Sequence, residues 1–182
     1  MNKKLKTVLT YGAIFSLPMI LMSVLAYVFD IGQNKAFGWI SIIIFITTLV
    51  IVQRSLRENY YKGFVSYGKL LGITLLVLTT SSIIMFLYTL LFYKVIAPEQ
   101  IDKMLEIARA NLYENDQLST AQIKQSIEFM TKYVFTPIAL SLTALGSTFG
   151  QGLVFSLITG IFIKKKQDGF TEAMKEINET EE

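Results

Sequence analysis

The sequence contains no cysteine and no histidine. Without cysteine, the chain has no disulfide, no thiolate metal site and no cysteine nucleophile. Without histidine, it lacks the commonest general base, the commonest metal ligand and the usual partner of a serine nucleophile. These absences exclude most familiar hydrolase designs. We therefore expect no enzymatic activity, no cofactor and no metal site.

Charged residues are also scarce, at 17% of the chain, where soluble domains usually carry about 25%. Hydrophobic residues make up 52%, and three prolines and eleven glycines are too few for a collagen-like or low-complexity chain. The charges are clustered, and four uncharged stretches separate the clusters: Thr7–Phe29, Ala36–Gln53, Leu70–Tyr93 and Tyr133–Ile163. A helix needs about 20 residues to cross the hydrocarbon core of a bilayer. The pattern therefore predicts an all-α polytopic membrane protein with four transmembrane helices.

The predicted spans cover residues 8–29, 36–53, 70–93 and 137–163, within a single membrane domain of residues 1–182. The fourth uncharged stretch has 31 residues, which is about 46 Å of helix. We therefore place its start at Pro137, with Thr136 as the N-cap. The first stretch could also belong to a signal peptide, but it is longer than the usual apolar region of about 7–15 residues. A retained first span is the favoured interpretation.

The basic residues are distributed unequally between the two predicted sides of the membrane. Eleven of the 17 lie on the side that holds the N-terminus, the loop 54–69 and the tail 164–182. Under the positive-inside rule, both termini are predicted to be cytoplasmic. The net charge of +3 then reflects topology, and we expect no nucleic-acid partner because no separate basic domain is present.

The loop 54–69 interleaves basic and aromatic residues. It could bind anionic lipid headgroups, but an ordinary positive-inside loop beside an aromatic belt has the same composition. The second interpretation is favoured. The tail 164–182 is expected to be a short helical extension that frays into an acidic end.

The extracytoplasmic region 94–132 is predicted to form two amphipathic helices between spans three and four. Pro98 suits a first helical position, Asn115–Asp116 separates the helices, and Ser119 with Gln122 forms a capping box. The two apolar stripes are Ile101, Met104, Leu105, Ala108 and Leu112, and then Ile123, Ile127, Met130 and Val134. They could pack against each other, lie in the headgroup region or dock an outer protein. The first two alternatives are favoured.

The last span carries a candidate helix-contact face. At 100° per residue, small residues fall on one side, and two of them form a G-x-x-x-G pattern. The members of this face are Ala139, Thr143, Gly146, Gly150 and Gly160. The face could pack within the chain's own bundle, which is the favoured interpretation, or against a second copy or another membrane protein. Gln151 is the most polar deep side chain, and its amide is expected to bond another helix.

The predicted spans contain no ionisable acid or base. Intramembrane charges usually mark ion and proton pathways, so their absence argues against a proton-coupled transporter. Four consecutive hydroxyls, Thr79 to Ser82, lie in the third span. We expect them to bond carbonyls of the preceding helical turn.

The chain resembles a known family in several segments. These are the loop segment 63–69 (GFVSYGK), Pro137 followed by 152–157 (GLVFSL), and the three lysines 164–166 that end the last span. They resemble the small bacterial inner-membrane proteins of domain-of-unknown-function family 4199. The resemblance implies four spans, a bacterial cytoplasmic membrane and no assigned activity or catalytic residue. The resemblance also implies that genes of this family are frequent neighbours of genes for polyprenol-phosphate glycosyltransferases. This neighbourhood suggests a link to envelope assembly.

Two functions are compatible with these observations. The leading one is a non-enzymatic accessory or scaffold subunit that packs with another membrane protein, or forms a homo-oligomer, in the lipid bilayer. The alternative is a small transporter or multi-copy pore for a lipid-linked or apolar solute, which would use the hydroxyls of the third span and Gln151.

Overall fold

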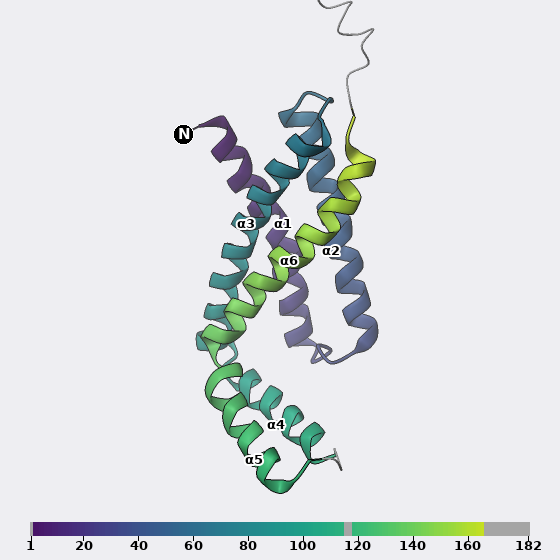
Figure 1. Ribbon diagram of the computed structural model, residues 1–182. Helices are drawn as coiled ribbons and strands as arrows, with labels where there is room; N and C mark the ends of the chain where they lie inside the picture. Colours follow the sequence, from purple (N-terminus) through teal and green to yellow (C-terminus); the bar gives the residue numbers. More distant parts are fainter. Residues whose placement is uncertain (1, 115–117, 166–182) are drawn as a thin grey trace, which may run out of the picture. The chain divides into compact units, whose positions relative to one another are not determined.

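The computed structural model describes residues 2–114 and 118–165. Four of its helices are long and apolar enough to cross a membrane: α1 (Lys3–Val28), α2 (Lys35–Ser55), α3 (Tyr67–Leu91) and α6 (Pro137–Ile163) (Figure 1). The predicted all-α polytopic membrane fold is confirmed. Two shorter helices, α4 (Glu99–Tyr113) and α5 (Thr120–Phe129), lie between α3 and α6. The Asn115–Asp116 break and most of the tail 164–182 lie outside the described residues.

The ends of α2 and α6 lie within two residues of the predicted spans, whereas α1 begins five residues and α3 three residues before the predicted starts. α6 begins at Pro137 and ends at Ile163 as predicted, and the Thr136 hydroxyl accepts a hydrogen bond from the Ala139 N–H at 3.2 Å. α2 and α3 are each extended by a π-helical turn, at Leu56–Tyr60 and Phe92–Ile96. The length of the uncharged stretches therefore located the four spans. The π-helical turns at the ends of α2 and α3 could not be predicted, because they leave no signal in the composition.

The chain divides into two compact units. The first contains Met1–Ser81 with Gly150–Glu182, and the second contains Ser82–Phe149. α3 and α6 each contribute one part to each unit.

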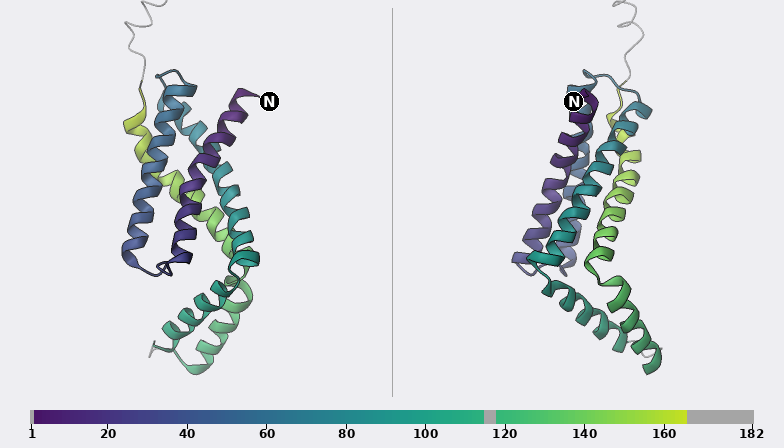
Figure 2. Two further views of the ribbon diagram at one scale, coloured as in Figure 1. Left: turned by 180° about the vertical axis from the view of Figure 1, so that it is seen from behind. Right: turned by 90° about the vertical axis from the view of Figure 1, so that its left-hand side faces the viewer.

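In the first unit, α1 and α2 run antiparallel and side by side (Figures 1 and 2). Asn34 caps the N-terminus of α2 by accepting a hydrogen bond from the Ala36 N–H at 2.8 Å. The rings of Phe15 and Phe45 meet edge to face with centroids 5.1 Å apart. The large apolar side chains that are fully buried in this unit include Phe15, Leu49, Leu56, Leu70 and Leu78. These contacts form the core that positions the polar networks described below.

α1 and α3 approach each other closely at Gly12. A Cβ at this position would lie only 2.6 Å from Cγ2 of Thr80 and 2.7 Å from its Cβ. The Ser81 hydroxyl lies 2.9 Å from the Gly12 carbonyl oxygen and 3.0 Å from that of Val77, so its proton is shared between two helices. Backbone proximity thus permits an interhelical hydrogen bond, as is common where glycine lies at a membrane helix interface.

In the second unit, α4 and α5 form an antiparallel hairpin (Figure 2). Leu105 of α4 and Ile123 of α5 are buried, and the other predicted stripe residues of α4 are half-buried. The predicted capping box is confirmed, since the Ser119 N–H donates to Gln122 Oε1 at 2.9 Å and the Gln122 N–H to Ser119 Oγ at 3.4 Å. The two helices therefore contact each other, which is one of the two favoured alternatives for their apolar stripes.

Two details of this hairpin differ from the sequence expectation. Pro98 is the N-cap of α4 and not its first helical residue. Val134 is exposed, although the second stripe predicts it to be buried. The reason is a π-helical turn at Met130–Val134, which widens the helix and turns Val134 out of the register of an α-helical stripe.

Candidate helix-contact face and polar networks

α6 has one exposed and one buried side. Within the first unit, the buried residues of α6 are Gly152, Ser156, Gly160 and Ile163, and the exposed ones are Gln151, Val154, Leu157, Ile158, Ile161 and Phe162. Gly152 packs directly against the Leu78 side chain, and a Cβ at Gly160 would lie 3.1 Å from Cε2 of Tyr67. These two glycines therefore hold α6 against α3.

The predicted helix-contact face lies mainly on the exposed side. Gly146 and Gly150 have open space where a Cβ would project, Thr143 is exposed and Ala139 is half-buried. Gly160 is separated from this set because it is buried against Tyr67. Sequence reasoning grouped Gly160 with the others and missed Gly152, since a helical wheel gives no information about which side meets a neighbour.

Gln151 is exposed, and its amide makes no hydrogen bond within the described part of the chain. The predicted bond to another helix is therefore not made by Gln151 inside the described chain. The buried amide is instead Gln53 at the end of α2, a residue that the sequence analysis treated only as a span boundary.

Gln53 connects α2 to α6. Its side chain is fully buried, its Oε1 lies 2.7 Å from the Thr159 hydroxyl, and its Nε2 donates to the Ser156 carbonyl at 3.5 Å. The Thr159 hydroxyl also lies 2.9 Å from the Phe155 carbonyl oxygen in its own helix. This network satisfies a polar side chain inside the bundle, which an apolar surrounding would otherwise make costly.

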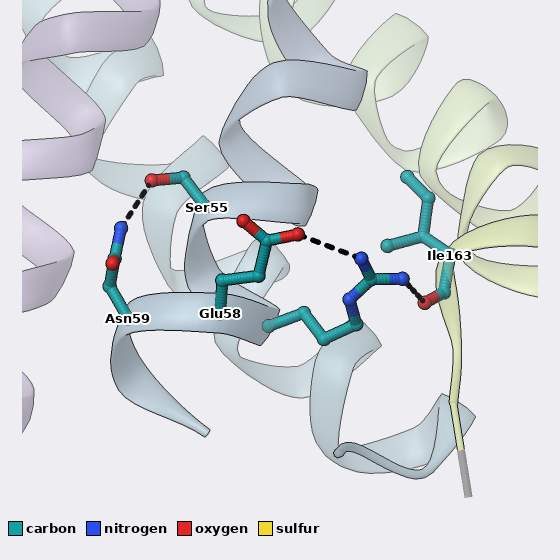
Figure 3. A network of polar contacts seen from close by, with 5 residues as sticks. Ser55, Glu58, Asn59 and Ile163 are labelled. Atoms are coloured by element: carbon teal, nitrogen blue, oxygen red, sulfur yellow. Dashed lines mark hydrogen bonds and ion pairs between the residues drawn. The ribbon is translucent and has the colours of Figure 1, made fainter. Parts of the chain in front are cut away.

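A second polar network lies at the end of the first unit where α1 begins, α2 and α6 end and α3 starts, which we call the basic end. Arg57 donates from Nη1 to the Ile163 carbonyl at 3.1 Å and from Nη2 to Glu58 at 2.8 Å (Figure 3). The guanidinium group therefore caps the C-terminus of α6, where free carbonyls favour a positive charge.

The loop after α2 is fixed by further contacts with α6. Val65 and Lys165 exchange two backbone hydrogen bonds of 2.8 and 3.1 Å, and Nζ of Lys165 lies 5.4 Å from the centre of the Phe64 ring. The Tyr67 hydroxyl donates to the Leu157 carbonyl at 3.0 Å. The loop and the end of α6 are therefore one structured assembly.

The turn of this loop contains two consecutive residues with positive φ, Lys62 at 55° and Gly63 at 94°. Glycine adopts this region freely, whereas a long side chain with a Cβ is disfavoured there. A non-glycine residue held in this region costs on the order of 1 kcal/mol. Lys62 is exposed, so no buried contact of its side chain offsets this cost.

Tyrosine side chains of the basic end connect its helices and its loop. Burial raises the pKa of Tyr61, and the neighbouring Tyr60 raises it further. The Tyr61 hydroxyl donates to the Lys69 carbonyl at 3.1 Å, and the Tyr11 hydroxyl lies 2.7 Å from that of Ser55. These rings connect α1, α2 and the start of α3 at one level of the bundle.

Charge at the basic end is strongly unbalanced. Within the described residues, nine basic side chains lie there with one acidic side chain, Glu58. The basic residues are Lys3, Lys4, Lys6, Arg54, Arg57, Lys62, Lys69, Lys164 and Lys165. This distribution agrees with the predicted topology, whose assignment to the cytoplasmic side stays a prediction.

The hydroxyls of the third span are mostly satisfied by their own helix. Thr79 donates to the Leu75 carbonyl at 2.9 Å and Thr80 to that of Leu76 at 3.1 Å. Ser81 adds the bond to α1 described above. Ser82 is buried, and its hydroxyl has no hydrogen-bond partner within residues 2–114 and 118–165. The expectation of bonds to the preceding turn is thus met at three of the four positions.

The described residues contain no group of three or more acidic side chains that could hold a metal ion. Comparison with curated proteins and with solved structures found no match. One family matches over residues 10–165, which include most of α1 and all of the other five helices. The chain therefore belongs to the family of proteins of unknown function DUF4199, as the sequence resemblance implied.

Proposed function

We propose that this protein is a non-enzymatic accessory subunit that packs with another protein of the bacterial inner membrane through the exposed side of α6. The observation that carries this proposal is the position of Gln151. It is the fifteenth of the 27 residues of α6, it is exposed, and its side-chain amide makes no hydrogen bond within the described residues.

An exposed amide in the middle of a span has no favourable partner in lipid. Hydrocarbon offers neither donors nor acceptors, and an unpaired amide costs about 2 kcal/mol or more in an apolar environment. A helix of another membrane protein can supply the missing hydrogen bond. Gly150 directly precedes Gln151, and Gly146 lies about one turn before Gly150 on the same helix. The open space at both glycines would allow a partner backbone to come close.

The alternative function, a transporter or multi-copy pore, has less support. It relies on polar groups that could face a solute, but Thr79 and Thr80 donate to carbonyls of their own helix. Hydroxyls bonded in this way are poorly placed to replace the hydration of a solute. We therefore retain the accessory role as the single proposal.

The proposal is tested by replacing both glycines with leucine, as Gly146→Leu with Gly150→Leu, and identifying neighbours by crosslinking and mass spectrometry in native membranes. Two leucine side chains would keep a partner helix at a distance. The matched control is Gly38→Leu with Gly72→Leu, since these glycines also lie in membrane-spanning helices and have open space at the Cβ position. We expect crosslinks to membrane proteins to be lost in the first variant only.

Gln151→Leu provides an independent arm, because it removes the amide without adding bulk. Loss of the same crosslinks would support the role of the hydrogen bond. Unchanged neighbours in both the leucine pair and Gln151→Leu would overturn the proposal. Crosslinks exclusively between copies of this chain would replace the accessory role with a homo-oligomer.

A further inference from the structure

We infer that the basic end of the first unit is a binding site for the phosphate headgroups of anionic phospholipids, centred on Lys62, Lys165 and Lys69. This inference concerns a different surface from the exposed side of α6, and it does not depend on the proposed function.

The three lysines are brought together by the fold. Lys165 exchanges two backbone hydrogen bonds with Val65, which is three residues from Lys62. The Tyr61 hydroxyl donates to the Lys69 carbonyl at 3.1 Å, which holds the start of α3 beside the same turn. All three lysine side chains are exposed. Their backbones are thus fixed before any ligand arrives, which lowers the entropy lost on binding.

The acidic group at this end is already paired. Glu58 lies 2.8 Å from Arg57, whose other amino group bonds the Ile163 carbonyl. Within the described residues no second acidic side chain lies at the basic end, so the positive charge of the three lysines is not balanced by that part of the chain. A ligand with an exposed phosphate complements this surface.

The position of the patch along the bundle matches the depth of a lipid headgroup. α6 has 27 residues, which gives about 40 Å of helix. A bilayer including its headgroup regions is about 40–45 Å thick. Lys164 and Lys165 follow directly after α6, and Tyr61 and Phe64 belong to the residue types found at membrane interfaces. A phospholipid therefore fits the patch better than a soluble polyanion.

The conformation of Lys62 adds an argument that composition alone does not provide. Its φ of 55° would suit glycine or asparagine better, and its exposed side chain makes no compensating buried contact. The presence of a lysine at this unfavourable backbone position is explained if its ammonium group binds a ligand. An ordinary topology signal would be served equally well by a lysine elsewhere in the loop.

The test uses the full chain in phosphatidylcholine vesicles that contain spin-labelled phosphatidylglycerol or spin-labelled phosphatidylcholine as probes. Electron paramagnetic resonance then gives the relative association of the two lipids with the protein. We expect the wild type to prefer phosphatidylglycerol. Lys62→Gly with Lys165→Gln should lower this preference by roughly fivefold for each lysine removed.

The charge-matched control is Arg109→Gln with Lys124→Gln, which removes two exposed charges from α4 and α5. It should leave the lipid preference unchanged. Lys62→Arg keeps the charge and should also keep the preference. The six carboxylates of residues 166–182 are the same in every variant. Lys62→Gly also removes the backbone strain of the positive φ. If Lys62 had only a structural role, this variant would therefore keep the lipid preference of the wild type.

Three results would overturn the inference. One is an equal preference for both lipids in the wild type. Another is an equal loss in the test and control pairs, which would indicate a non-specific charge effect. The third is complete displacement of phosphatidylglycerol by millimolar inorganic phosphate, which would show that a free anion is the ligand. None of these results bears on the crosslinks of α6, so the two proposals can fail separately.

Discussion

Single residues determine where the helices of the first unit can approach each other, and Gly12 is the clearest case. We predict that Gly12→Ala destabilises the protein, because the new methyl group would lie 2.6 Å from Cγ2 and 2.7 Å from Cβ of Thr80. Overpacking of this kind typically costs about 1–3 kcal/mol. It would also weaken the 2.9 Å hydrogen bond between Ser81 and the Gly12 carbonyl. Unfolding in mixtures of dodecyl sulfate and maltoside, followed by circular dichroism, measures the effect.

Gly72→Ala is the matched control for this prediction. Gly72 also lies within a membrane-spanning helix, but nothing lies within 4 Å of a Cβ at that position. Alanine has a higher helix propensity than glycine, so this variant should be as stable as the wild type or more stable by up to about 1 kcal/mol. Equal stability of the two alanine variants would contradict the close approach of α1 and α3.

The two glutamines of the spans have opposite environments. Gln53 is fully buried and bonded to α6, whereas Gln151 is exposed. We predict that Gln53→Leu and Thr159→Val are energetically coupled, because their side chains share a 2.7 Å hydrogen bond. Interhelical hydrogen bonds in membranes contribute about 0.6 kcal/mol on average and up to about 1.7 kcal/mol. A double-mutant cycle of unfolding free energies measures this coupling.

A cycle that pairs Gln53→Leu with Thr79→Val controls for non-specific effects. The Thr79 hydroxyl donates to the Leu75 carbonyl in its own helix, whereas the Gln53 amide bonds Ser156 and Thr159 of α6. This second pair should be additive. Additivity in the first cycle as well would mean that the hydrogen bond between α2 and α6 contributes nothing to stability.

At the scale of elements, α5 is the helix whose start is most clearly encoded. The capping box formed by Ser119 and Gln122 satisfies N–H groups that the first helical turn leaves unpaired. We predict that Ser119→Ala lowers the stability of α5 by about 1 kcal/mol. Amide hydrogen exchange within Thr120–Phe129 should then become faster by roughly fivefold if exchange follows local opening.

Gln125→Ala serves as the control for the cap, since Gln125 is exposed in the middle of α5. Alanine is a good helix former, so exchange in α5 should not become faster. If Ser119→Ala leaves exchange unchanged as well, packing of the buried Ile123 would be sufficient to hold the helix without its cap.

Elements could be predicted from sequence more reliably than their contacts. Pro137 and Ile163 bound α6 as predicted, because an uncharged run, a cap and a proline each leave a local signal. Which side of α6 faces α3 is not a local property. Gly152 and Gly160 are buried by Leu78 and Tyr67, while Gly146 and Gly150 have open space, and all four glycines look alike in the sequence.

The same limit explains the missed polar network. Gln53 lies beside Arg54 at a span end, where a polar residue is ordinary. Its burial depends on Ser156 and Thr159, more than 100 residues away in the chain. The positive φ of Lys62 was equally hidden, since a lysine before a glycine in a loop does not by itself indicate a left-handed turn. Long-range packing, which composition and periodicity do not contain, determines the burial of Gln53.

At the scale of the whole molecule, the arrangement of charge predicts which end of the spans faces the cytoplasm. The basic end combines Lys62 and Lys165 with the start of α1, and its described part contains a single acidic residue. Lysine and arginine near span ends favour the cytoplasmic side. This bias predicts that Lys62 lies inside the cell and Lys124 of α5 outside it.

The natural chain has no cysteine, so any introduced thiol is unique and the topology can be tested directly. We predict that a membrane-impermeant maleimide labels the Lys124→Cys variant in intact spheroplasts but labels the Lys62→Cys variant only after the membrane is permeabilised. Both positions are exposed, so burial does not limit the reaction of either thiol. Labelling in the reverse order would place both termini outside the cell. The nine basic residues of the basic end would then contradict the positive-inside rule, and the lipids available to Lys62 would be those of the outer leaflet.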